Sequence, residues 1–229
     1  MNTALLRQLC ETPGVPGHEH RVRDLIISEI GGLFDEVTTD PMGSLMCVRR
    51  ANVADAPKVM LLCHMDEIGF LVSHISKDGY LYLQPVGGFD PRTLFSRRVR
   101  VCTDDGDFHG VMNPGGKPIH ISSPEDRKKI PPVGEFFIDL GMGAKSHDHI
   151  KVGDFVVMEE PFLEMGDKFV SKALDNRVAC WLGIEAIRAL ADEGRGAEIH
   201  VVFTTQEEVG LRGARTAAFA VRPGIGIGI

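Results

Sequence analysis

The first thirty residues carry their apolar side chains at helical spacing. Val22, Leu25, Ile26 and Ile30 recur every three or four positions, and Gly31-Gly32 follows them. This spacing predicts a helix with one buried face, and paired glycines are typical of a helix end. Pro13-Gly14 separates this segment from an earlier apolar one, so the sequence predicts two short helices here.

A continuous apolar run, KVMLLCH, occupies 58–64, and a largely apolar segment, AEIHVVFTT, occupies 197–205. Runs of this kind predict strands that are buried on both faces of a sheet. The segments FDEVTTD (34–40) and SLMCVRR (44–50), with a Pro-Met-Gly turn between them, predict a β-hairpin. Helical spacing returns at 174–194 and 211–220, and GIGIGI at 224–229 begins another predicted strand.

Between about residues 70 and 165 the pattern changes to short strands separated by turn residues, such as Lys77-Asp78-Gly79 and Asn113-Pro114-Gly115. Regularly spaced short strands without long helices favour a small barrel or sandwich. We therefore expect an α/β domain formed by residues 1–69 and 165–229, interrupted by a β-barrel-like insertion of residues 70–164.

Composition narrows the classes of function. The chain of 229 residues has 43% hydrophobic and 25% charged residues and a mild net charge of −7, which argues against a nucleic-acid-binding protein. No apolar run approaches the ~20 residues that a membrane helix needs, and we expect neither a membrane partner nor a signal peptide. Five scattered cysteines without a CxxC pair favour reduced thiols and a cytoplasmic location.

Candidate chemistry begins at the end of the run 58–64, where His64 and Asp66 lie two positions apart. Alternate side chains of a strand share a face, and ligands bind at the carboxyl ends of strands in open α/β sheets. His64 is a candidate metal ligand and Asp66 its orienting partner. The alternative is a polar strand end that only caps a loop.

Three more carboxylates lie where strands or loops lead into helices. Asp175 opens the predicted helix 174–194, where it is either an N-cap or a ligand between two cations. Glu207 and Glu208 follow the run 197–205. One of this pair could bind metal while the other handles protons, or both could be solvated acids at a helix start.

These clusters belong to the motifs CHMDEIGF (63–70), KALDNR (172–177) and TTQEEVGLRGA (204–214). In this order, with a β-rich insertion after the first, they closely resemble the tetrahedral (TET) aminopeptidases, dinuclear metallopeptidases whose members were often labelled endoglucanases. The resemblance extends through KPIHISSPEDRK, FFIDLG and IKVGDFVV inside the insertion. It implies a three-layer metallopeptidase domain of sheet and helices, interrupted by the insertion.

The resemblance implies a role for each candidate. His64 and Glu208 would be terminal metal ligands, Asp175 the bridging ligand and Glu207 the general base, with Asp66 supporting His64. The implied cofactors are two divalent ions per subunit, zinc or cobalt. The implied partners are short peptides and further copies of the chain, which dimerise through the insertion and assemble into dodecamers.

The sequence departs from the family at its end. The family's two remaining ligands, an Asp after the next strand and a distant His, lie beyond the last of the three motifs, and the sequence ends with GIGIGI. We therefore expect a piece of a longer protein. The alternatives are a catalytically incomplete subunit that acts in assembly and, less in keeping with a single Trp and two Tyr, a glycosidase.

Overall fold

The structure is a computed structural model that describes residues 2–191 and 193–229. Its chain divides into two compact units, one formed by the part up to Glu67 together with Pro161–Ile229 and the other by Ile68–Glu160. The first unit is an α/β layer structure and the second is a closed β-barrel, as the sequence pattern predicted.

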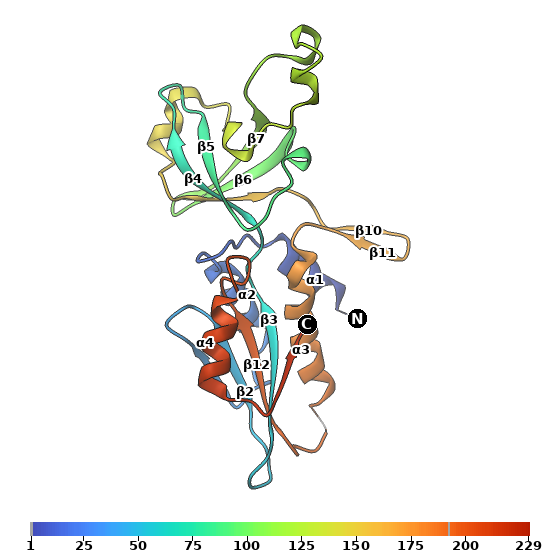
Figure 1. The fold of residues 1–229 in the computed structure, drawn as a ribbon. Coiled ribbons are helices and arrows are strands. Elements are labelled where there is room, and N and C mark those ends of the chain that lie inside the picture. Colours follow the sequence, from blue (N-terminus) through green and yellow to red (C-terminus); the bar gives the residue numbers. More distant parts are fainter. Residues whose placement is uncertain (1, 192) are drawn as a thin grey trace. The chain divides into compact units, whose positions relative to one another are not determined.

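Within the described residues, the α/β unit contains four helices and a five-stranded sheet in the order β1-β2-β12-β3-β13 (Figure 1). Its helices are α1 (Thr3–Glu11), α2 (His20–Glu29), α3 (Leu174–Ala189) and α4 (Arg212–Val221). Its sheet is formed by β1 (Glu36–Thr39), β2 (Leu45–Arg49), β3 (Lys58–His64), β12 (Glu198–Thr204) and β13 (Ile225–Gly228). A two-stranded ribbon, β10 (Leu163–Met165) with β11 (Lys168–Val170), completes the unit.

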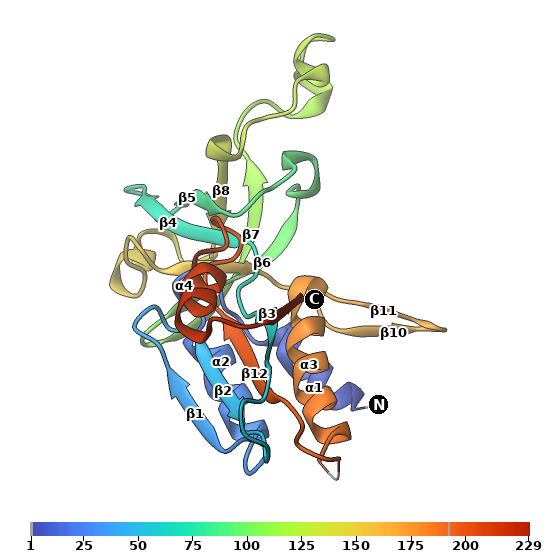
Figure 2. The ribbon, with the colours of Figure 1, turned by 60° about the horizontal axis from the view of Figure 1, so that its bottom comes forward.

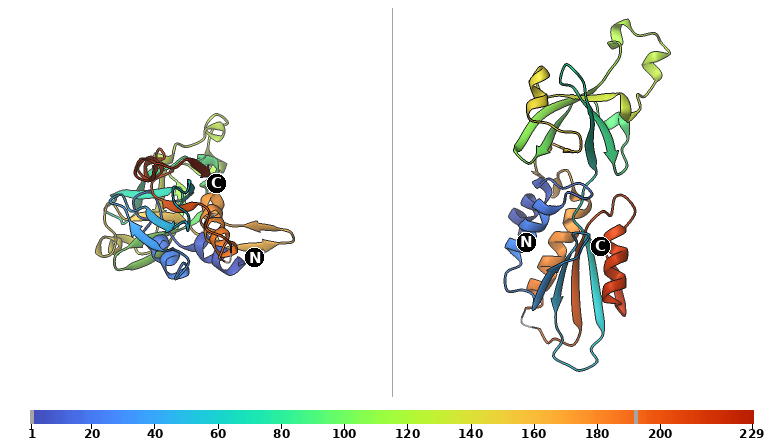
Figure 3. Two further views of the ribbon diagram at one scale, coloured as in Figure 1. Left: turned by 90° about the horizontal axis from the view of Figure 1, so that it is seen from below. Right: turned by 90° about the vertical axis from the view of Figure 1, so that its left-hand side faces the viewer.

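Helices cover both faces of this sheet. Figure 3 shows α4 on one face, with α1, α2 and α3 on the other. Along β12, Val201 and Phe203 join the core under α1, α2 and α3, whereas Val202 packs with Ala217 and Val221 of α4. The two faces of one strand therefore bury apolar side chains in two different cores, which is why residues 201–203 of β12 are all apolar.

The central strands β12 and β3 run parallel, so their carboxyl ends meet at one edge of the sheet (Figure 2). The register pairs Thr204 with His64 at that edge. The predicted hairpin 34–50 is confirmed, because β1 and β2 pair antiparallel. Strand β13 pairs parallel with β3 as predicted, but Ile225 and Ile227 on this edge strand are 54% and 45% exposed.

One predicted helix boundary is wrong by a few residues. Helix α3 ends at Ala189 rather than at Gly194, because helical bonding gives way to turns after Leu190. Asp192, inside the predicted range, lies outside the described residues. At the other end of α3, Asp175 and Asn176 have non-helical backbone angles, so the regular helix begins after them.

The second unit is a barrel whose strands close in the order β4-β5-β8-β7-β6-β9. These strands are β4 (Gly69–Ile75), β5 (Leu81–Val86), β6 (Arg97–Thr103), β7 (Gly106–Pro114), β8 (Phe136–Asp139) and β9 (Phe155–Met158). Alternate side chains point inward and form one apolar core around Phe70, Val99, Val101, Phe136 and Ile138. Of the two arrangements that the strand pattern allowed, the structure adopts the barrel.

None of the helices in the described part of the chain is both long and apolar enough to cross a membrane.

Candidate metal centre

The sequence-predicted residues converge on one small cavity at the carboxyl edge of the sheet in the α/β unit. His64 ends β3, Glu207 and Glu208 follow β12, and Asp175 lies at the start of α3. The cavity has a volume of about 360 Å³ and is lined by Leu62, His64, Asp175, Asn176, Thr204, Glu207, Glu208, Leu211, Ala214, Gly228 and Ile229. No lysine or arginine is among these described lining residues.

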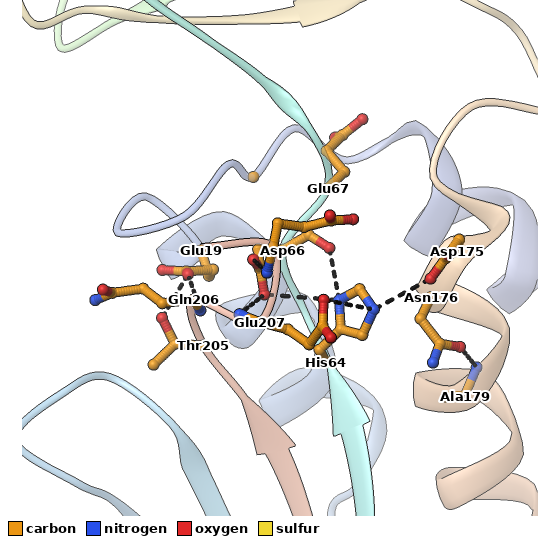
Figure 4. Close-up of polar contacts among 12 residues, drawn as sticks. Glu19, His64, Asp66, Glu67, Asp175, Asn176, Ala179, Thr205, Gln206 and Glu207 are labelled. Carbon is orange, nitrogen blue, oxygen red and sulfur yellow. Dashed lines mark hydrogen bonds and ion pairs between the residues drawn. The ribbon is translucent and has the colours of Figure 1, made fainter. Parts of the chain in front are cut away.

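The nitrogen and oxygen atoms of the candidates are close enough to share a cation. One ligand atom from each of His64, Glu207 and Glu208 lies within 4.8 Å of the other two. Asp175 Oδ1 lies 3.2 Å from His64 Nε2, and Glu207 Oε2 lies 3.8 Å from the same nitrogen (Figure 4). Three carboxylates around one imidazole, with no cationic side chain in the lining, are the donor set that a divalent cation such as zinc prefers.

The closely spaced carboxylates and their burial shift the pKa values of two cavity residues, Glu208 and His64. Burial raises the pKa of the Glu208 carboxyl to about 7, and the neighbouring carboxylates add to the rise. Burial lowers the pKa of His64, but hydrogen bonding and charge from Asp66, together with the charge of Glu207, outweigh it, so this pKa lies above its usual value. Negative charge is therefore in excess here, and a bound cation would relieve it.

Asp66 lies beside the cavity and connects two of the motifs. Its backbone oxygen is 3.0 Å from Nδ1 of His64, while its carboxylate lies 3.6 Å from the same atom. The fully buried carboxylate accepts the backbone N–H groups of Glu207 at Oδ1 and of Glu208 at Oδ2, both at 3.0 Å. Asp66 thus accompanies His64, as the sequence predicted, and also holds the backbone of both glutamates.

Asp175 is not the N-cap of α3, which was the alternative to a ligand role. The cap bond comes from Asn176, whose Oδ1 accepts the N–H of Ala179 at 2.9 Å. The Asp175 side chain is 90% exposed and points at His64 (Figure 4). The Asp175 carboxylate therefore does not cap the helix. The sequence alone left open whether Asp175 caps α3 or faces the cavity, because the adjacent Asn176 is equally able to form the cap.

A buried ion cluster that sequence reasoning missed joins the first two motifs. Glu67, the residue after Asp66, accepts a hydrogen bond from Lys172 Nζ at 2.7 Å and lies 3.5 Å from Arg177. The Arg177 guanidinium is fully buried and also donates to the backbone oxygens of Leu9, Thr12 and Gly14. Charges of opposite sign in the first two motifs, Glu67 in one and Lys172 and Arg177 in the other, were the available signal, because such groups are buried only when they are paired.

A second missed residue is Glu19, which lies before α2 and far from the motifs in sequence. Its buried carboxylate contacts Thr205 and Gln206, immediately before Glu207 (Figure 4). No spacing rule connects residue 19 with residue 205, so this contact required the tertiary structure.

Comparison with known proteins shows which family this chain resembles. Residues 43–229 match the family described as M42 glutamyl aminopeptidase. A lysyl aminopeptidase from Pyrococcus furiosus is 35% identical over 97% of this chain, and the chain spans 64% of the length of that relative.

Solved structures agree with these matches. A TET aminopeptidase from a marine sediment archaeon (Thaumarchaeota archaeon SCGC AB-539-E09) superimposes with a TM-score of 0.92 at 36% identity, over 99% of this chain and 64% of the other. The Pyrococcus horikoshii TET1 peptidase, described as assembling into a tetrahedron or a large octahedral shell, gives 0.89 at 31% identity over 99% of this chain and 68% of the other. The chain belongs to the M42 glutamyl aminopeptidase family.

Proposed function

We propose that the complete protein is a metal-dependent aminopeptidase that removes N-terminal residues from short peptides. The observation that carries the proposal is the cluster of His64, Glu207 and Glu208, whose ligand atoms lie within 4.8 Å of one another in a cavity lined by no cationic side chain. Membership of an aminopeptidase family supports it. The activity is assigned to the complete protein because this chain spans 64% of the lysyl aminopeptidase.

Each candidate residue has a proposed role. His64 and Glu208 would hold one cation each, and Asp175, whose Oδ1 lies 3.2 Å from His64 Nε2, would bridge a pair of zinc or cobalt ions. The chemistry that bound cations supply is polarisation of the scissile carbonyl and acidification of a water. The remaining ligands would come from parts of the complete protein outside this sequence.

Glu207 is the proposed general base. Its carboxylate lies at the cavity wall with its backbone fixed by Asp66, so it can take a proton from the water whose oxygen attacks the carbonyl carbon. The same proton then passes to the leaving amine nitrogen as the carbon–nitrogen bond breaks. Asp66 takes no part in the proton transfer; it keeps His64 and the glutamates in place.

The barrel, predicted from sequence as residues 70–164, is the proposed dimerisation domain, and residues 1–69 and 165–229 belong to the catalytic domain. The TET1 relative can assemble into a tetrahedron or a large octahedral shell, which supports a homo-oligomer here. All five cysteines are buried and free of disulfides, which supports the proposed cytoplasmic location.

A Glu207→Gln variant of the complete protein tests the mechanism. We expect kcat for hydrolysis of amino-acid anilides to fall by at least 10²-fold, because the amide cannot accept the proton, while zinc binding persists. Chelation with EDTA should abolish wild-type activity, and added zinc or cobalt should restore it. The matched control is Glu193→Gln, an acid outside the cavity that should leave kcat unchanged. Unchanged activity in Glu207→Gln would refute the proposed role of Glu207.

A further inference from the structure

Residues that are not themselves candidate metal ligands hold the turn that carries Glu207 and Glu208. Glu19 precedes α2 at the N-cap position, yet its side chain makes no capping bond to that helix. It is only 4% exposed, and its Oε1 accepts the N–H of Gln206 at 2.9 Å, the Thr205 hydroxyl and the N–H of Gly17 at 2.9 Å. A buried carboxylate is tolerated when donors surround it in this way.

Gln206 shows why this contact matters for the turn. Its φ of 55° places a residue with a side chain in the left-handed region, a strained conformation that persists only where neighbours enforce it. Glu19 accepts the N–H of this residue. After the left-handed step, the N–H groups of Glu207 and Glu208 both reach the Asp66 carboxylate.

Two buried acids therefore hold four consecutive residues. Glu19 binds Thr205 and Gln206, and Asp66 binds Glu207 and Glu208. Thr205 is also anchored through its backbone, which accepts from the N–H of Gly213 at 3.1 Å. These contacts hold the backbone from which the side chains of Glu207 and Glu208 extend into the cavity.

We propose that Glu19 is a positioning residue that fixes the Glu207–Glu208 turn, so that these two carboxylates face His64 before a cation binds. Its consequence for metal affinity rests on the function proposed above; its consequence for the conformation of the turn does not. Preorganised ligands bind a cation without first being ordered, and loss of a supporting partner around metal ligands typically costs 10–100-fold in affinity.

The test compares Glu19→Ala and Glu19→Gln in the complete protein, with Glu29→Gln as the control. Glu29 is the last residue of α2, the helix that Glu19 precedes, and its half-buried side chain pairs with Arg188, so its loss removes an ion pair of α2 without touching the turn. Without metal, we expect hydrogen exchange at the amides of Gln206, Glu207 and Glu208 to accelerate at least tenfold in Glu19→Ala. Glu19→Gln should recover much of the protection, because its amide oxygen can still accept hydrogen bonds.

A second readout is zinc affinity, which should fall 10–100-fold in Glu19→Ala and less in Glu19→Gln, while kcat falls with little change in KM at saturating zinc. If Glu19→Ala does not fold, Thr205→Val removes one of the contacts and should show the same acceleration to a smaller degree. Wild-type exchange rates at these amides in the variants would overturn the positioning role. Wild-type protein that bound no zinc would instead overturn the proposed function.

Discussion

Two kinds of residue surround the cavity: candidate ligands that line it and residues that hold the backbone or side chains of these candidates. Asp66 illustrates the second group, because both oxygens of its carboxylate are engaged by backbone N–H groups. Glu208 illustrates the first, with a carboxyl pKa raised to about 7 by burial and by neighbouring carboxylates. The negative charge of Glu208 is destabilising in the metal-free protein and would become favourable beside a bound cation.

The raised pKa of Glu208 predicts a pH-dependent effect of Glu208→Gln on the metal-free protein. Folding raises this pKa from 4.5 to about 7, so the stability it contributes is fully present below pH 4.5 and is lost as pH rises through 7. In EDTA, the glutamine variant should therefore unfold at a higher temperature than wild type at pH 8, with the difference shrinking towards pH 5. Thermal unfolding at both pH values checks this; a difference that is the same at both would contradict it.

At the scale of elements, functional side chains lie where regular structure begins or ends. Strands β3 and β12 bring His64 and the two glutamates to one edge because they are parallel neighbours. At the start of α3 two adjacent residues make different contacts, a division of roles in which Asn176 caps the helix while Asp175 faces His64.

This division predicts opposite outcomes for two neighbouring substitutions in α3. Asn176→Ala should lower the unfolding free energy of the metal-free protein by about 1 kcal/mol, because the N–H of Ala179 loses its cap. Asp175→Asn should change that free energy by less than about 0.5 kcal/mol, since its side chain is 90% exposed, but should strongly weaken zinc binding. Urea unfolding in EDTA together with zinc titration measures both. Equal destabilisation by the two changes would show that Asp175 does help to cap the helix.

At the scale of the whole molecule, each unit has its own apolar core, and the barrel also exposes apolar side chains. Ile119 and Ile121, between β7 and β8, are 72% and 62% exposed. Neighbouring exposed isoleucines are costly in water and typical of an interface between subunits. They fit the proposal that copies of this chain associate through the barrel.

Replacing both isoleucines with lysine should disrupt that association. We expect the native mass of the complete protein, measured by light scattering after gel filtration, to fall at least twofold, because two buried charges per subunit would be introduced into the interface. Val53→Lys, at an exposed valine of the α/β unit, is the control and should leave the mass unchanged. An unchanged mass in the double variant would argue that the subunits meet through another surface.

The sequence by itself determined much of this protein. Apolar runs identified β3 and β12, turn residues at short intervals identified the β-rich insertion, and three motifs named His64, Asp66, Asp175, Glu207 and Glu208. These features are readable because periodicity and local chemistry are written in neighbouring residues.

Only the tertiary structure decided which groups meet. The capping bond of Asn176 depends on the direction of its side chain. Two other features depend on contacts between distant segments: the buried pairing of Glu67 with Lys172 and Arg177, and the hydrogen bonds of Glu19 with Thr205 and Gln206. Glu19 and Gln206 are 187 positions apart. No local pattern encodes such a contact. It exists because α2 packs against the sheet, which places the buried Glu19 carboxylate beside the hydroxyl of Thr205 and the N–H of Gln206 at the end of β12.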